Sequence, residues 1–188
     1  MTQRHLLYIA FFFPPSRASG VYRALATARK FVESGWKVTV ITTTEDFFYR
    51  EIGTVDLSLV ELVPKEIEVI RIPFSLSGLS ELKSIREYSR FHANFARLYN
   101  YCYAKLILPR YFKKLKNFIS GRTNSAFLTG DNYASWIDPA VKAIRNVDKK
   151  NKVDCILATG NPFSSFEVAR LASALTSTPF SVDYRDPW

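Results

Sequence analysis

The first fifty residues contain the pattern that most restricts the possible fold: a strand, a helix and a second strand in close succession. Residues 6–12 are an unbroken apolar run, as expected for a strand whose sheet is covered on both faces. From Val21, apolar residues recur at helical spacing, and Gly35 follows as a natural helix terminator. Residues 37–43 are again strand-like. A strand–helix–strand unit of this length implies a parallel sheet and therefore an α/β fold.

The same alternation continues along the chain. Further strands are expected at residues 55–63, 67–72, 126–128, 153–158 and 180–184, and further helices at residues 136–147 and 163–175. We therefore predict one domain over residues 1–188, a Rossmann-like, doubly wound parallel sheet. With 188 residues, 47% of them hydrophobic, the chain can bury a substantial core.

The positive charge of the chain is concentrated in its middle. The net charge is +9, and residues 80–120 alone carry nine Lys and Arg against two Glu. We predict that this segment is a basic helical insertion with interleaved aromatic side chains. Either its apolar face covers the sheet, or it binds an anionic membrane surface. The cations available for a membrane would be Lys83, Arg86, Arg90, Arg97, Lys113 and Lys114.

Composition argues against several classes of protein. No segment approaches the roughly 20 apolar residues that a membrane-spanning helix needs, and residues 6–13 lack the pattern of a signal peptide. The only histidines are His5 and His92, and the two cysteines, Cys102 and Cys155, are far apart. We therefore expect a cytoplasmic protein with free thiols and with no metal or other cofactor.

The first candidate binding loop leads into the helix that begins after Gly20. Backbone N–H groups and the helix dipole favour an anion there, and Arg17 and Arg23 add positive charge. Glycine lets a phosphate approach the backbone closely, but it could equally serve only to turn the chain. Neither a Gly-x-Gly-x-x-Gly fingerprint nor a Walker lysine is present, which weakens both common nucleotide-binding interpretations.

The second candidate loop, residues 159–165, lies between a predicted strand and a predicted helix. Asn161 could cap that helix with Pro162 at its first position, or Ser164 or Ser165 could cap a later start. Alternatively, Asn161 contacts a ligand, because open α/β sheets bind ligands at the carboxyl ends of their strands.

The third candidate group follows the last predicted strand. Asp183, Arg185 and Asp186 could form a buried ion pair, or Arg185 could position a carboxylate that faces a sugar hydroxyl. Asp131 and Trp136 form a weaker cluster of the same polar and aromatic kind. We expect these residues to border a ligand-binding crevice at the carboxyl edge of the sheet.

Five stretches together resemble the N-terminal, Rossmann-like half of a GT-B glycosyltransferase of the retaining GT4 family. They follow the family's order over nearly the whole chain, at residues 13–23, 35–40, 131–136, 154–162 and 183–188. The resemblance implies transfer of a sugar from a nucleotide-sugar donor to a glycan or lipid-linked acceptor, with retention and without a metal. It also implies a C-terminal donor domain that is absent here, so these residues alone are expected to be inactive.

The resemblance also suggests roles for individual residues. Ser19 and Gly20 would meet the donor diphosphate through backbone N–H groups, with Arg23 adding charge. The acceptor would lie beside Asn161, Asp183, Arg185, Asp186, Asp131 and Trp136. No residue matches the histidine that several relatives carry near the reaction centre, so no catalytic residue is assigned. Such enzymes commonly build envelope polysaccharides at the inner membrane face, so a peripheral membrane location is expected.

Two other classes of function stay open. The basic helices could belong to a nucleic-acid-binding module, although nucleic acid is not the expected partner. The chain could also be a non-catalytic domain that binds sugar or lipid.

Overall fold

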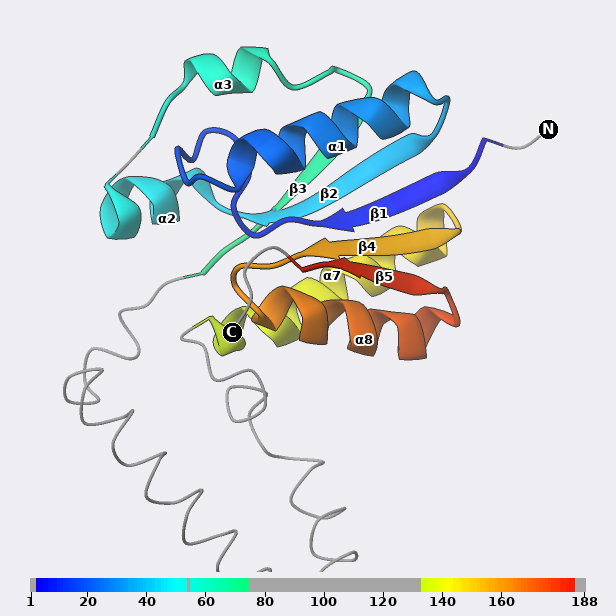
Figure 1. Ribbon diagram of the computed structural model, residues 1–188. Helices are drawn as coiled ribbons and strands as arrows, with labels where there is room; N and C mark the ends of the chain where they lie inside the picture. The colour runs from blue at the N-terminus through cyan, green and yellow to red at the C-terminus, as the bar shows by residue number, and fades with distance from the viewer. Residues whose placement is uncertain (1–2, 54, 75–132, 185–188) are drawn as a thin grey trace, which may run out of the picture. The chain divides into compact units, whose positions relative to one another are not determined.

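A computed structural model describes residues 3–53, 55–74 and 133–184 (Figure 1). These residues form a five-stranded, all-parallel sheet with the strand order β3-β2-β1-β4-β5. The strands are β1 (His5–Ile9), β2 (Lys37–Thr43), β3 (Ile67–Ile72), β4 (Cys155–Thr159) and β5 (Phe180–Asp183). The basic segment at residues 80–120 and the strand expected at residues 126–128 lie outside the described residues.

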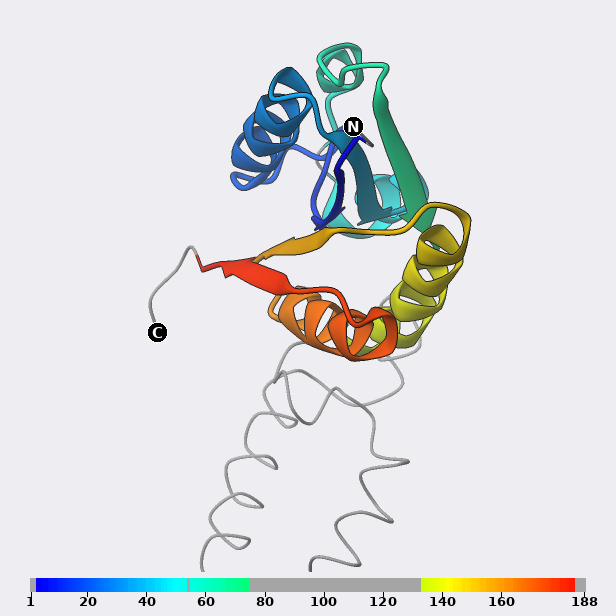
Figure 2. The same cartoon turned by 90° about the vertical axis from the view of Figure 1, so that its right-hand side faces the viewer.

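Helices cover both faces of the sheet. On one face lie α1 (Val21–Glu33) and the short α3 (Ser58–Glu61), and on the other lie α7 (Ile137–Lys150) and α8 (Ser164–Thr176) (Figures 1 and 2). The turn of α2 (Glu45–Phe47) and a π-helical turn (Phe48–Ile52) follow β2, and a 3-10 turn (Ala134–Trp136) leads into α7. The predicted α/β class with a parallel, doubly wound sheet is therefore confirmed for the described residues.

The central strand β1 explains why the core forms where it does. All five of its residues are buried, because its side chains alternate between two covered faces. Leu6 and Tyr8 point toward α1 and pack with its buried face, which includes Ala24, Leu25 and Ala28. Each large apolar side chain buried in this way contributes about 1.5–3 kcal/mol of transfer free energy.

The end of α1 follows the sequence prediction. Gly35 has a φ of +82°, in the left-handed region that favours glycine, and its N–H donates to the Val32 carbonyl over 2.8 Å. The chain then enters β2 directly. A helix that stops abruptly after 13 residues fixes the position of its first turn relative to the end of β1.

Two predicted elements differ from the structure. The strand predicted at residues 55–63 is wrong, since Ser58–Glu61 is the helical turn α3. The carboxylate of Asp56 accepts hydrogen bonds from the Ser58 N–H (3.0 Å) and hydroxyl (2.6 Å), and this local turn prevails over β propensity. The first strand is also shorter than the predicted run of residues 6–12. It ends at Ile9, and Phe11 and Phe13 lie buried in the loop that follows.

None of the helices within residues 3–53, 55–74 and 133–184 combines the length and the apolar character needed to cross a bilayer.

Candidate functional site

The strands β1 and β4 are neighbours at the centre of the sheet, but the chain leaves them toward opposite faces. The helix after β1 is α1, on one face, and the helix after β4 is α8, on the other (Figure 1). Open α/β sheets bind their ligands at such a topological switch point. The segments that meet there carry five of the predicted residues: Ser19, Gly20, Arg23, Asn161 and Asp183.

The loop from β1 to α1 is held by hydrogen bonds from other parts of the sheet. The Arg71 guanidinium, on β3, donates to the Pro14 carbonyl over 2.7 Å, and the Asp56 N–H donates to the Pro15 carbonyl over 2.8 Å. Arg71 also pairs with Glu45 at 3.2 Å, and its half-burial lowers the pKa of the guanidinium. These contacts fix the path that the chain takes toward the first turn of α1.

The first turn of α1 has no side-chain cap. Gly20 occupies the capping position with helical dihedral angles (φ −76°, ψ −16°), which any residue can adopt. A chain turn therefore does not require glycine here, and the missing Cβ remains its distinguishing property. Ser19 and Arg23 are exposed beside it. The Val21 N–H already donates to the Ala18 carbonyl over 2.9 Å, so the later N–H groups of this turn, the helix dipole and the guanidinium are what favour a bound anion.

The structure joins a residue predicted for the donor to one predicted for the acceptor. Arg23 of α1 donates from Nη2 to Oδ1 of Asp183, at the end of β5, over 2.5 Å. The Arg23 side chain is 53% exposed, whereas that of Asp183 is 19% exposed. The pair therefore connects an accessible cation with a carboxylate that is largely covered.

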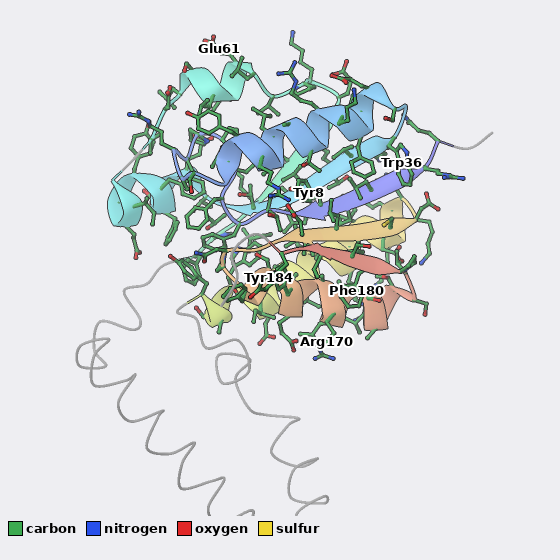
Figure 3. The ribbon with its side chains drawn as sticks, in the orientation of Figure 1. Tyr8, Trp36, Glu61, Arg170, Phe180 and Tyr184 are labelled. Carbon is green, nitrogen blue, oxygen red and sulfur yellow. The ribbon has the colours of Figure 1, made fainter. Side chains whose placement is uncertain are left out.

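Two hydroxyl groups lie close to this ion pair. Thr159 Oγ1, at the end of β4, lies 3.1 Å from the Gly160 carbonyl and 3.4 Å from Oδ2 of Asp183. Tyr8 is fully buried under α1 (Figure 3), and its hydroxyl makes no hydrogen bond of standard geometry to the described residues. The Tyr8 hydroxyl is therefore a buried polar group that needs an explanation.

The pKa of Tyr8 reports on its surroundings. Burial and the negative charge of Asp183 raise this pKa to about 12, despite the opposing influence of the Thr27 and Thr159 hydroxyls and of the Arg23 charge. Tyr8 is thus a neutral phenol at physiological pH, able to donate one hydrogen bond.

The turn from β4 to α8 is determined by packing. A Cβ on Gly160 would lie 2.7 Å from the ring of Phe166, so any larger residue there would force that ring to move. The Gly160 N–H donates to the Asp183 carbonyl over 3.1 Å, which ties this turn to β5. The peptide bonds on both sides of Asn161 are cis.

The capping predictions for α8 were wrong. The helix begins at Ser164 with Phe163 in the capping position, so none of the three polar residues Asn161, Ser164 and Ser165 acts as the predicted N-cap. The rings of Phe163, Phe166 and Tyr184 pack together and fix this start without a polar cap. Asn161 is left exposed on the turn, next to the switch point.

Trp136 belongs to the core. Its side chain is fully buried, and its ring meets that of Phe11 edge to face with centroids 5.0 Å apart. Four other aromatic rings surround Phe11 in the same way, those of Phe12, Phe47, Phe74 and Tyr133. The Trp136 ring therefore has no exposed surface to offer an acceptor in this structure and supports the sheet edge from inside.

Several predicted residues lie outside the described residues. These are the acceptor candidates Asp131, Arg185 and Asp186 and the membrane candidates Lys83, Arg86, Arg90, Arg97, Lys113 and Lys114.

Sequence reasoning missed two residues that shape the site, Tyr8 and Arg71, and it placed Thr159 in the second candidate loop without giving it a role. A polar tyrosine in the apolar run of β1 and a lone arginine near the end of β3 were the available signals, because buried polar groups need partners. Thr159 carried no such signal, since threonine is common in strands.

No cluster of three His, Cys, Asp or Glu side chains within the described ranges could hold a metal ion. No protein-family model matches this chain, and no curated protein matches it either.

Proposed function

We propose that this chain is the acceptor-side, N-terminal half of a retaining GT-B glycosyltransferase of the GT4 family. Its donor would be a nucleotide-sugar and its acceptor a glycan or a lipid-linked sugar. The family assignment rests on the five sequence stretches described above. The parallel sheet, with its switch point between β1 and β4, is compatible with that family.

One observation carries this proposal. The ion pair between Arg23 and Asp183 brings the two predicted halves of the site into contact at the switch point. Arg23 follows the uncapped first turn of α1, which suits a diphosphate. Asp183 offers a carboxylate, which suits a sugar hydroxyl as hydrogen-bond donor. A site that transfers a sugar needs the donor phosphate and the acceptor hydroxyl close together, and these two groups are suited to one each.

The chemistry assigned to this chain is positioning and charge stabilisation. The N–H groups of the first turn of α1, together with Arg23, would stabilise the negative charge of the departing nucleoside diphosphate. Asp183 and Asn161 would hold the acceptor hydroxyl near the sugar carbon that reacts. No general base is assigned to the described residues. Donor contacts from a C-terminal domain are part of the proposal and would complete the site.

The basic segment at residues 80–120 extends the proposal to the location of the enzyme. Its net charge of +7, with interleaved aromatic residues, is suited to an anionic bilayer surface. We assign it as a basic helical insertion that brings a cytoplasmic enzyme to the inner membrane face, where lipid-linked acceptors are found.

The complete gene product provides the test. It is incubated with a panel of nucleotide-sugars and an extract of lipid-linked acceptors, and the anomeric configuration of any product is determined by NMR. We expect transfer with retention, and we expect Arg23→Gln to lower kcat/KM by about 10- to 100-fold because a cation next to the leaving group is lost.

The matched control is Arg170→Gln on α8. Arg170 pairs with Glu167 at 2.6 Å and is 54% exposed, nearly as exposed as Arg23, but it lies on the opposite face of the sheet from Tyr8 (Figure 3). Its loss should leave kcat/KM unchanged. Inversion of configuration, or equal activity in the Arg23 and Arg170 variants, would contradict the proposal.

A further inference from the structure

The pair of Arg23 and Asp183 is unusual among the ion pairs of the described residues. Most of the others join residues three or four positions apart, whereas this one joins α1 to β5 across 160 residues of sequence. The long-range pair of Arg71 and Glu45 is also anchored by hydrogen bonds to backbone carbonyls. For Arg23, the only contact of its guanidinium described here is with Asp183.

A second observation at the same place is the Tyr8 hydroxyl. It is fully buried and makes no hydrogen bond of standard geometry to the described residues, although the Thr27 and Thr159 hydroxyls lie near enough to lower its pKa. The carboxylate of Asp183 is near enough to raise the Tyr8 pKa. Oδ1 of that carboxylate accepts from Arg23, and Oδ2 lies 3.4 Å from Oγ1 of Thr159.

We propose that Arg23 is exchanged between Asp183 and an anionic ligand, so that binding of a phosphate releases the Asp183 carboxylate. This inference rests on the proposed function, in which the phosphate belongs to the donor and Asp183 serves the acceptor. The freed carboxylate accepts the hydrogen bond of Tyr8 and faces the acceptor hydroxyl. Donor binding therefore completes the acceptor site, and the two substrates bind in that order.

The physical requirements for such an exchange are met. An ion pair whose arginine is half exposed is worth only about 0–1 kcal/mol, so its loss is readily offset. A phosphate offers two oxygens to the planar guanidinium, and the dipole of α1 attracts it as well. Neither attraction is lost when the Arg23 side chain turns away from Asp183. The backbone of Asp183 stays in place because it lies at the end of a strand paired with β4, and its carboxylate turns toward the Tyr8 hydroxyl once Arg23 has left.

The test measures the binding of inorganic pyrophosphate to this chain by calorimetry at low ionic strength. Asp183→Asn should bind pyrophosphate about fivefold more tightly, the factor that corresponds to about 1 kcal/mol, because Arg23 no longer has to leave a carboxylate. Arg23→Gln should bind it at least about tenfold more weakly. The double variant should match Arg23→Gln, since the effect of Asp183 acts through Arg23.

Two matched variants separate the exchange from general charge effects. Glu167→Gln removes an equally well covered carboxylate from the exposed pair on α8, and its affinity for pyrophosphate should equal that of the unmodified chain. Tyr8→Phe should weaken binding by about threefold, because the released carboxylate loses its hydrogen bond. This second variant keeps both charges and tests the exchange even where Asp183→Asn does not fold.

Three results would overturn the exchange: unchanged or weaker binding by folded Asp183→Asn, equal tightening in the Arg23→Gln background, or unaltered binding by Tyr8→Phe. The proposed function is tested separately, by sugar transfer. Pyrophosphate binding with the expected pattern but without transfer would leave the exchange intact and remove the glycosyltransferase. Sugar transfer by a protein whose Asp183→Asn variant binds pyrophosphate with unchanged affinity would leave the glycosyltransferase intact and remove the exchange.

Discussion

The sheet has one edge at the amino ends of its strands, the amino edge, and one at their carboxyl ends, the carboxyl edge. These two edges are built differently. At the amino edge, the buried ring of His5 is satisfied on both sides, with Nδ1 3.2 Å from the Lys152 carbonyl and Nε2 2.8 Å from Oγ1 of Thr39. A neutral ring protonated at Nδ1 donates to that carbonyl, and its Nε2 shares the single Thr39 hydroxyl proton with Oε2 of Glu68, which lies 3.1 Å from the same Oγ1. At the carboxyl edge, Tyr8 is just as deeply buried, but its hydroxyl makes no such hydrogen bond to the described residues.

The contrast separates stabilising polar groups from groups kept for a ligand. Buried polar groups that serve stability alone are normally paired, because leaving one unpaired costs more than a hydrogen bond gains. The amino edge follows this rule closely. The carboxyl edge departs from it at the topological switch point, where open α/β sheets bind ligands. The Tyr8 hydroxyl and the predicted site therefore lie at the same end of the sheet, whereas Nε1 of Trp136 makes no hydrogen bond to the described residues either and has no role in the site.

The largest effect is expected at Arg71, which secures the loop of the carboxyl edge. Arg71→Leu removes the 2.7 Å hydrogen bond to the Pro14 carbonyl and leaves Glu45 without its partner. Hydrogen bonds to charged groups are worth about 1.5–3 kcal/mol, so the free energy of unfolding should fall by about 2 kcal/mol. Urea denaturation followed by circular dichroism measures it.

The control for Arg71 is Arg50→Leu. Arg50 pairs with Asp46 on the surface and is 77% exposed, so its replacement should change the free energy of unfolding by less than about 0.5 kcal/mol. Equal losses in the two variants would mean that Arg71 has no special role in holding the loop.

The sequence was sufficient to predict most of the fold. Residues 37–43 and 67–72 coincide with β2 and β3, and α1 begins at Val21 as expected. Such elements are predictable because one buried face imposes a period of two or 3.6 residues over their whole length. The error at Ser58–Glu61 has the opposite origin, since a single carboxylate, that of Asp56, redirected a segment that is otherwise rich in β-forming residues.

The site was predictable only in outline. Chemistry pointed to Arg23 and Asp183 separately, but no local pattern shows that residues 160 positions apart form one ion pair. Gly160 illustrates the same limit, because the ring that excludes a Cβ belongs to Phe166 and depends on how α8 packs. Trp136 was assigned to the acceptor from its polar neighbours, whereas the structure buries it against Phe11. Tertiary packing decided each of these cases.

The amino edge gives the second prediction, a pH dependence. Burial, and secondarily the charge of Lys37, lower the pKa of His5 below its usual 6.5, against the opposing effects of the Lys152 and Asn151 carbonyls and of Glu68. Above pH 6.5 the folded and unfolded states both hold a neutral ring. As the pH falls below 6.5, the unfolded state takes up the proton first, so stability declines until the pH passes the folded pKa.

The measurement compares the unmodified chain with His5→Gln in urea between pH 8 and pH 5. The difference between their free energies of unfolding should be constant above about pH 7 and should shrink toward pH 5. Parallel curves over this range would show that His5 takes up protons equally in both states, and the amino edge would then lack the closed hydrogen bonding described above.

The smallest effect is expected at Tyr8, and it has the opposite sign. Tyr8→Phe removes a buried hydroxyl that makes no standard hydrogen bond to the described residues and keeps the ring that packs under α1. Without a ligand, the variant should therefore be more stable by up to about 1 kcal/mol, as measured by urea denaturation.

A comparable replacement at the amino edge, Thr39→Val, should instead be destabilising by about 1 kcal/mol, because its hydroxyl is engaged with His5. If Tyr8→Phe also lowered stability by that amount, the Tyr8 hydroxyl would be bonded to Thr27 or Thr159 in the resting protein. The two edges would then be equally well satisfied, and the phenol would not be available to the released carboxylate of Asp183. We therefore expect Tyr8→Phe to raise the free energy of unfolding and to weaken pyrophosphate binding. Both effects together require a hydroxyl that forms its hydrogen bond only when the ligand is bound.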